Sequence, residues 1–530
     1  GNARYRHSLG VTLHAMGRYE EAAAEKRKAV ELDPDSARYH ENLGITLYEM
    51  REQEDALKET RKAVELEPGN ARYHSSLGVV LHEAGQLEEA EAEKRRAAEL
   101  DPGNPQYRDS LGATLYKLKQ YPQALEETRR AVELEPGSAR YHSNLGVILH
   151  TMGRYQEAEA EKRRATELAP DSAQYRYNLG VTLHELGRYE EAAAEKRRAA
   201  ELDPGNARCH NSLGVTLHAM GRYEEAEAEK RRAAELAPGN ARYRHSLGVT
   251  LHAMGRYEEA EAEIRRAVEL KPDSALFRNS LGVVLHAMGR YEEAEAEKRR
   301  AAELEPDDPL YLSNLGVTLH VMGRYEEAET EKRRAVELNP DDPQYHDSLG
   351  VTLHELGRYQ EAEAEKRRAA ELAPDNARYR SSLGVTLHAM GRYEEAAGEK
   401  QKAVELDPDN ARYHSSLGMT LHIMERYQEA EAEKRRAVEL EPGNARYHDS
   451  LSVTLHEMGQ YQEAESESRA AVELEPGNAQ YHDSLGITLH ELGRYEEAAG
   501  EKQKAVDLDL GNAQYRSSLD ATLEQLSEHT

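Results

Sequence analysis

Residues 239–272 read GNARYRHSLGVTLHAMGRYEEAEAEIRRAVELKP, and this stretch decides the fold because the chain repeats it. The pattern recurs every 34 residues with no insertion or deletion. Its closing proline is found at Pro34, Pro68, Pro102, Pro136, Pro170, Pro204, Pro238, Pro272, Pro306, Pro340, Pro374, Pro408, Pro442 and Pro476, and Leu510 takes the fifteenth place. A fixed period of about 20 to 50 residues is typical of a stacked array. The sequence therefore predicts one solenoid, although a length of 530 residues would ordinarily suggest several globular domains.

The first half of the unit has the spacing of an amphipathic helix. Apolar residues recur at steps of three and four: Tyr243, Leu247, Leu251 and Met254. This stripe predicts a helix from about Ala241 to Met254. Asn240 is a suitable N-cap because its side chain can accept a hydrogen bond from a first-turn amide. Gly255 supplies the left-handed residue that ends a helix at little cost.

The second half of the unit predicts another helix, from about Tyr257 to Leu270. Its small and apolar residues share one face: Tyr257, Ala260, Ile264, Ala267 and Val268. Pro272 stops the helix and begins the turn to the next unit. Each unit is therefore expected to be an antiparallel helix pair, and the fold class is all-α, an α-solenoid of tandem helix pairs.

The unit closely resembles the tetratricopeptide repeat in Leu247-Gly248, Gly255, Tyr257, Ala260, Ala267 and Pro272. The resemblance covers the whole chain. It implies fifteen tandem repeats over residues 1–510 and a half-repeat over residues 511–530, whose helix caps the C-terminal end. It also implies a right-handed superhelix whose first helices form a concave wall, and members of the family usually bind their ligands on that wall.

Two positions depart from the family pattern. Arg or His, as in Arg244 and His40, stands near the start of the first helix where the family has a large aromatic residue. Lys, as in Lys26, replaces the aromatic residue in the middle of the second helix. We expect this lysine to lay its methylenes over the seam between repeats and to keep its ammonium in water. Gly248 is expected at a helix crossing, where a larger side chain would overpack.

The family's wall positions, carried onto this sequence, give a mostly basic ladder. It consists of Arg4, Arg38, Arg72, Arg140, Arg208, Arg242, Arg378, Arg412 and Arg446. If these side chains point inward, an acidic protein has a basic inner wall, along which an extended acidic or polar peptide or an anionic glycan could lie. The alternative is that the arginines pair with Glu of neighbouring second helices. A small polar ladder, from Ser8 and Asn42 onward, accompanies them.

A third ladder is histidine in thirteen of the fifteen repeats. Its members are His14, His82, His150, His184, His218, His252, His286, His320, His354, His388, His422, His456 and His490, and Tyr48 and Tyr116 fill the two gaps. Equivalent residues of stacked repeats lie about 10 Å apart, too far for two ligands of one zinc ion. The sequence therefore favours half-buried rings whose nitrogen meets a polar group. The other interpretation is a functional lining that becomes charged near pH 6.

Composition restricts the classes of function. The formal net charge of −29 argues against binding to nucleic acid phosphates. No apolar run approaches the roughly 18 residues needed to span a bilayer. Cys209 is the only cysteine and replaces a packing Tyr, so no intramolecular disulfide is possible. No nucleophile elbow, phosphate-binding loop or singular acid–base cluster is present, so neither an enzyme nor a cofactor or metal site is expected.

Three functions fit these observations. The first is a scaffold that binds proteins or peptides along the concave wall. The second is a subunit of a fibre, with self-association through the first repeat, where Tyr5 and Leu9 match an internal repeat and no polar cap precedes them. The third is the recognition arm of a larger enzyme such as a glycosyltransferase. No secretory leader is visible, which favours the cytoplasm, whereas a fibre-forming chain would be expected outside the cell.

Overall fold

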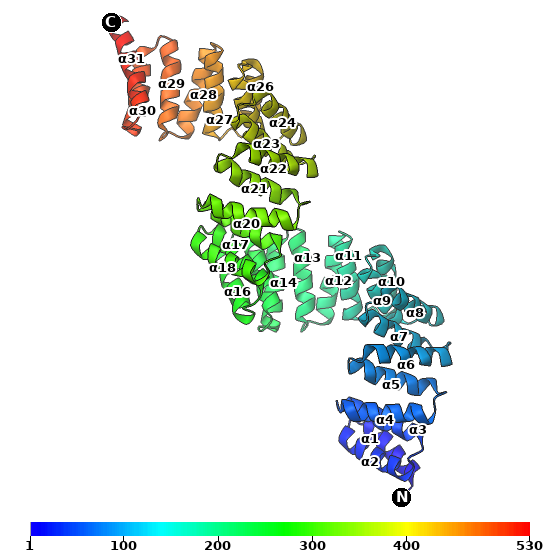
Figure 1. Cartoon of the computed structure of the whole chain (residues 1–530). Coiled ribbons are helices and arrows are strands. Elements are labelled where there is room, and N and C mark those ends of the chain that lie inside the picture. The colour runs from blue at the N-terminus through cyan, green and yellow to red at the C-terminus, as the bar shows by residue number, and fades with distance from the viewer. Residues whose placement is uncertain (1, 530) are drawn as a thin grey trace. The chain divides into compact units, whose positions relative to one another are not determined.

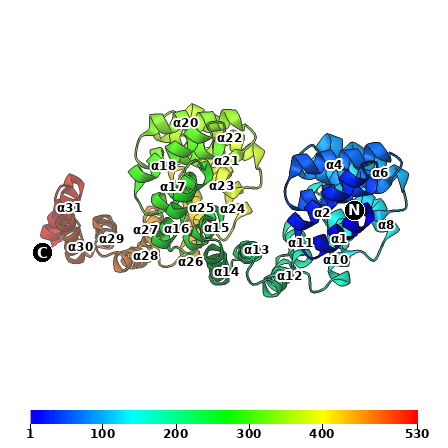
Figure 2. The ribbon, with the colours of Figure 1, turned by 90° about the horizontal axis from the view of Figure 1, so that it is seen from below.

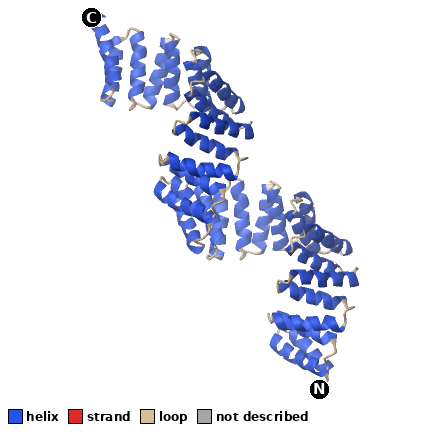
Figure 3. Cartoon of the chain, in the orientation of Figure 1, coloured by secondary structure: helices blue, strands red, loops and turns tan. Residues whose placement is uncertain are grey.

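The structure of the protein is a computed structural model that describes residues 2–529, with side chains up to Ser527. Its described residues form 31 α-helices. Figure 3 shows these helices joined by loops, and no strand occurs among the described residues. The predicted all-α fold is therefore confirmed. The odd-numbered helices from α1 to α29 are the first helices of the repeats, the even-numbered helices are the second helices, and α31 follows the last pair.

The first helices have nearly identical bounds within each repeat. They are α1 (Ala3–Ala15), α3 (Ala37–Glu49), α5 (Ala71–Glu83), α7 (Pro105–Lys117), α9 (Ala139–Thr151), α11 (Ala173–Glu185), α13 (Ala207–Ala219), α15 (Ala241–Ala253), α17 (Ala275–Ala287), α19 (Pro309–Val321), α21 (Pro343–Glu355), α23 (Ala377–Ala389), α25 (Ala411–Ile423), α27 (Ala445–Glu457) and α29 (Ala479–Glu491).

The second helices are one residue longer. They are α2 (Tyr19–Leu32), α4 (Gln53–Leu66), α6 (Leu87–Leu100), α8 (Tyr121–Leu134), α10 (Tyr155–Leu168), α12 (Tyr189–Leu202), α14 (Tyr223–Leu236), α16 (Tyr257–Leu270), α18 (Tyr291–Leu304), α20 (Tyr325–Leu338), α22 (Tyr359–Leu372), α24 (Tyr393–Leu406), α26 (Tyr427–Leu440), α28 (Tyr461–Leu474) and α30 (Tyr495–Leu508). The final helix is α31 (Ala513–His529).

Helix ends follow the predicted signals with one correction. Asn240 accepts a hydrogen bond from the backbone N–H of Arg242 at 3.0 Å, as a capping residue should. The first helix ends at Ala253, one residue before the predicted end, and Met254 is its C-cap with φ −83° and ψ −1°. Gly255 follows with φ +74°, a conformation that costs glycine little.

The chain divides into two compact units, Gly1–Leu270 and Lys271–Thr530. Within each unit, every helix packs against the helices before and after it, and Figure 1 shows this stacking in chain order. First helices of successive repeats also contact each other, as α3 and α5 do, whereas among the described residues no two second helices do so. The first helices therefore lie on the concave side of each unit. Figure 2 shows second helices such as α20 and α22 around the outside.

We call the exposed surface of the first helices the first-helix wall and the interface between consecutive repeats a seam. The core beneath the wall is thin and made largely of leucine and alanine, such as Leu213, Leu217 and Ala226. A Cβ added at Gly214 would lie 3.0 Å from the carbonyl oxygen of Ala226 and 2.6 Å from Cγ of Lys230. The recurrence of this glycine at one position of the repeat thus reflects a close helix crossing, as predicted for its equivalent Gly248.

No helix among the described residues is long and apolar enough to cross a membrane. Cys209 is buried against Ala199 and Ala200, the packing position that the sequence predicted for it.

Candidate binding wall

All nine arginines of the basic ladder are exposed near the start of a first helix, on the first-helix wall. Three of them bond to a buried acid on the first helix of the preceding repeat. Arg72 makes a two-pronged contact with Glu41, with Nε–Oε1 and Nη2–Oε2 distances of 2.9 and 3.0 Å. Arg378 lies 3.0 Å from Asp347, and Arg140 lies 3.4 Å from Asp109 in the same way.

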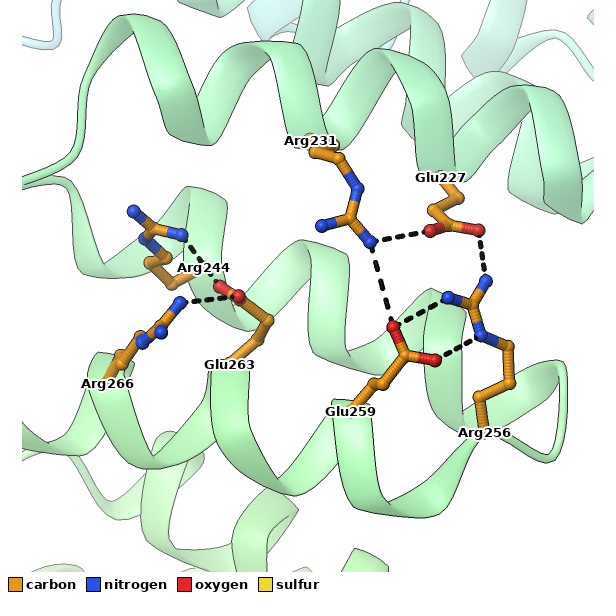
Figure 4. A network of polar contacts seen from close by, with 7 residues as sticks. All are labelled: Glu227, Arg231, Arg244, Arg256, Glu259, Glu263 and Arg266. Carbon is orange, nitrogen blue, oxygen red and sulfur yellow. Dashed lines mark hydrogen bonds and ion pairs between the residues drawn. The ribbon is translucent and has the colours of Figure 1, made fainter.

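The alternative that these arginines pair with Glu of neighbouring second helices is therefore wrong. Figure 4 shows second-helix glutamates that already have other arginine partners. Glu227 bonds to Arg231 at 2.7 Å and to Arg256 of the next repeat, and Glu259 bonds to Arg256 at 2.6 Å. Glu263 is held between Arg244 and Arg266.

The other wall arginines lack such a carboxylate. Arg208 stacks on Tyr177, with its guanidinium carbon 4.4 Å from the ring centroid. Arg4, Arg38, Arg242, Arg412 and Arg446 make no ion pair within residues 2–529. The wall is consequently a mixture of neutralised and free cationic positions.

In the second unit the wall is hollowed into a groove of about 500 Å³ along α21, α23 and α25. A second hollow of about 360 Å³ adjoins it along α23, α25 and α27 and shares Arg412 with it. Between the charged positions, Val385 and Met419 line the hollows and are 42% and 38% exposed. Serine hydroxyls, among them those of Ser382 and Ser416, complete the lining.

The histidine ladder lies at the seams. Nδ1 of His218 is 3.1 Å from Oγ1 of Thr250 in the next repeat, and its ring packs edge-on against Tyr223 at 5.1 Å between centroids. These are the contacts of a half-buried imidazole. Eleven seams contain the same His–Thr contact, made by His14, His82, His150, His184, His218, His286, His320, His354, His388, His422 and His490.

Burial acts against the interpretation in which this ladder becomes charged near pH 6. Burial, together with the nearby ammonium of Lys230, lowers the pKa of His218 below its usual 6.5. At the seam of Lys94, burial and that cation lower the pKa of His82 to about 4. The His218 and His82 rings therefore hold a proton less readily than a free imidazole does.

The lysine of the second helix does not keep its ammonium in water, which corrects the prediction from the sequence. Lys230 is 3% exposed, and its Nζ donates to Oγ1 of Thr250 at 2.7 Å and to the carbonyl oxygen of Ser246 at 3.2 Å. Two oxygen acceptors at the seam compensate for the lost hydration. Burial lowers the pKa of Lys230 to about 8.

Lysine, histidine and threonine form one unit, which we call the seam triad, defined by His218, Lys230 and Thr250. The Lys–Thr bond occurs at the same eleven seams as the His–Thr contact. Two of the other four repeat boundaries keep the histidine but not the lysine, with His252, Ile264 and Val284 at one and His456, Ser468 and Thr488 at the other. The remaining two have tyrosine in place of the histidine and an apolar residue in place of the threonine. Their residues are Tyr48, Thr60 and Val80 at one, and Tyr116, Thr128 and Ile148 at the other.

Sequence reasoning missed the seam triad, although a signal was present. In the two repeats where Thr60 and Thr128 replace the lysine, Tyr48 and Tyr116 replace the histidine. Val80 and Ile148 then replace the threonine of the next repeat. Such joint replacement across 20 and 32 residues indicates side chains in contact. Tyr48 packs against the apolar cluster that contains Val80, as such a contact requires.

A second histidine position explains the other departure from the family pattern. His40 contacts Glu59 through Nδ1 at 2.6 Å and the carbonyl oxygen of Pro34 through Nε2 at 2.9 Å. Arg176 takes the same two kinds of partner, since it donates to the carbonyl of Pro170 and to Glu195. The side chain at this position thus connects the turn between repeats to the second helix.

No three His, Cys, Asp or Glu side chains in the described part of the chain lie together as metal ligands would.

Sequence profiles described as tetratricopeptide repeat match residues 41–105, 151–207, 206–273, 245–309, 285–350, 353–420, 411–444 and 454–513. A profile described as TPR repeat matches residues 10–51 and 112–153. The comparison with curated proteins gave no match.

Similar solved structures include the APC/C hetero-tetramer Cut9–Hcn1, 14% identical with a TM-score of 0.45, covering 92% of this chain and 97% of that one. Yeast Tom70 is 15% identical with a TM-score of 0.39, covering 80% of this chain and 96% of that one. Naa15/Naa10 bound to HypK-THB is 12% identical with a TM-score of 0.36, covering 99% and 96%.

Proposed function

Because the chain belongs to the tetratricopeptide repeat family, we propose that it is a non-catalytic scaffold that binds extended polar or acidic segments of other proteins along its first-helix wall. The fold is typical of proteins that bind other proteins. The observation that carries the proposal is the wall itself, where exposed arginines recur at one position of successive first helices on the concave side of each unit.

In the nine repeats that have a wall arginine, the wall supplies three kinds of contact in the same order. Arginine offers charge-assisted hydrogen bonds to carboxylates. Serine or asparagine one turn further along offers hydrogen bonds to a peptide backbone. A small apolar residue follows, such as Val215 at 38% exposure. An extended segment can meet all three from repeat to repeat, whereas a compact ligand would meet only a few.

Binding should be measured by fluorescence anisotropy with labelled, unstructured peptides of acidic, polar, basic and apolar composition. The wall variants are Val79→Glu, Val215→Glu and Val385→Glu, which place a negative charge on exposed wall positions. The matched controls on second helices are Ala92→Glu, Ala228→Glu and Ala364→Glu, which are also exposed. We expect acidic and polar peptides to bind and the combined wall variant to bind them at least about tenfold more weakly. An equal loss of affinity in the second-helix control variants would contradict the proposal.

Self-association through the first repeat is a second candidate. Tyr5 and Met16 are 66% and 64% exposed. In this candidate, a second copy of the chain buries both side chains. Sedimentation over a hundredfold range of concentration tests the idea, with Tyr5→Glu as the variant that should lower the sedimentation coefficient at high concentration. A constant coefficient for the unaltered chain would exclude it.

A further inference from the structure

A single position decides whether a wall arginine is neutralised. Arg378 bonds to Asp347, which lies 31 residues before it on the preceding first helix. Arg72 and Glu41 have the same spacing and the same contact. The wall therefore has a free positive charge where an arginine follows a neutral residue at this spacing.

Two such arginines lie in consecutive repeats of the second unit, on α25 and α27. The residues 31 positions before Arg412 and Arg446 are Ser381 and Ser415. Neither arginine makes an ion pair with any residue that the structure describes. Asp449, one turn beyond Arg446, points to the next repeat, where it accepts a hydrogen bond from α29 at 3.2 Å. Both arginines line the hollowed part of the wall.

The spacing of these arginines matches one peptide conformation. Packed helices lie about 8–10 Å apart, and α25 and α27 are in contact. A polyproline II chain has three residues per turn and rises about 3.1 Å per residue. Residues i and i+3 of such a peptide therefore share a side and lie about 9 Å apart, so one repeat corresponds to three peptide residues.

We infer that the wall of α23, α25 and α27 binds an acidic peptide in the polyproline II conformation, with two carboxylates three residues apart on Arg412 and Arg446. An intervening apolar side chain packs against Val385 and Met419, which are exposed in the same hollows. The inference rests on the proposed function. It adds the negative charge of the ligand, the spacing of its carboxylates and the part of the wall where it binds.

The probe is the labelled peptide (Glu-Pro-Pro)4, compared with (Glu-Pro)6, which has closer carboxylates, and with (Gln-Pro-Pro)4, which has none. We expect (Glu-Pro-Pro)4 to bind most tightly, and its affinity to fall as salt rises because the contact is between charges. The variant Arg412→Gln/Arg446→Gln should weaken this binding about tenfold or more. Glutamine is native at this position in other repeats, for example Gln344, so the fold tolerates it.

Two further variants test whether the unpaired positive charge of Arg412 and Arg446, at this place on the wall, is what binds the peptide. Ser381→Asp/Ser415→Asp keeps both arginines and installs the acid that neutralises Arg378 elsewhere on the wall, so it should weaken binding as much as removing the arginines. Arg242→Gln makes the same substitution at an unpaired arginine of the other unit and should change affinity less than about twofold. Melting curves of all variants check that the fold is retained.

Equal affinity for the two spacings, or unchanged affinity in either double variant, overturns the inference. If peptides then still bind and the Val79→Glu, Val215→Glu and Val385→Glu variant still weakens them, the proposed function stands without this site. If no peptide of any composition binds, the proposed function falls as well. Binding of a heparin hexasaccharide more tightly than (Glu-Pro-Pro)4 would replace the peptide with an anionic glycan and also overturn the inference.

Discussion

Nζ of Lys230 lies 2.7 Å from Oγ1 of Thr250, and this bond crosses from one repeat to the next inside the protein. The same hydroxyl meets Nδ1 of His218 at 3.1 Å. A threonine hydroxyl can accept two hydrogen bonds and donate one, and here it also faces the carbonyl oxygen of Ser246. Each seam triad is therefore a satisfied polar network, and removing one member should cost more than replacing all three.

Thr250→Val should lower the free energy of unfolding of its seam by about 1–3 kcal/mol, because it leaves a buried ammonium with one acceptor fewer. The variant His218→Tyr/Lys230→Thr/Thr250→Val copies the native set Tyr48, Thr60 and Val80. It should lower the free energy of unfolding much less. Hydrogen exchange of the α14 and α15 amides measures both effects locally. A larger loss in the triple variant than in Thr250→Val would contradict the network.

Gly214→Ser should destabilise the same repeat, because its Cβ would lie 2.6 Å from Cγ of Lys230. Lys230→Ser should relieve the clash in the double variant. The chain itself contains this combination, since Ser452 stands at the glycine position of the repeat in which Ser468 replaces the lysine. We expect a cost of about 1–3 kcal/mol for the single variant, measured by urea denaturation, and additive losses in the double variant would contradict the crossing geometry.

The seams should weaken as pH falls. The pKa of His82 is lowered in the folded protein from 6.5 to about 4 by burial and by Lys94. Between these values the unfolded chain binds a proton that the folded chain does not, so stability falls as pH decreases from about 6.5 to about 4. His82→Tyr, which copies Tyr48, should reduce this pH dependence in hydrogen exchange of α6 and α7. An unchanged pH profile would exclude His82 as a contributor.

Glu425→Gly should stabilise the protein. Glu425 follows α25 with φ +59°, at the position where Gly391 and Gly459 have φ +74° and +72°. The left-handed conformation costs a residue with a Cβ about 1–2 kcal/mol, so we expect a gain of about 1 kcal/mol in local unfolding. Gly391→Glu is the reverse control and should lower the free energy of local unfolding by a similar amount. Both are measured by denaturation with hydrogen exchange to localise the change.

The outer ion pairs should contribute less than the seam triads and should depend on salt. Glu227→Ala removes the contacts with Arg231 and Arg256 and copies the native Ala193. Because both arginines are partly exposed, water and ions screen their attraction. The melting temperature should fall by less than half of the fall seen for Thr250→Val, and the difference should shrink as salt concentration rises. A salt-independent loss would indicate a packing role for Glu227.

The 34-residue pattern determined the repeat, the helix pairs, the capping asparagine and the left-handed glycine, because local propensity and short-range spacing decide these features. The resemblance of Leu247-Gly248 and Pro272 to one family was equally local. Tertiary structure decided the rest. The ammonium of Lys230 bonds to Thr250 and is not in water, and Arg378 bonds to Asp347 and not to a second-helix glutamate. Both outcomes depend on which side chains two consecutive repeats place within a few ångströms of each other. Burial and charge at those contacts, and not residue type, set the pKa of Lys230 and His218.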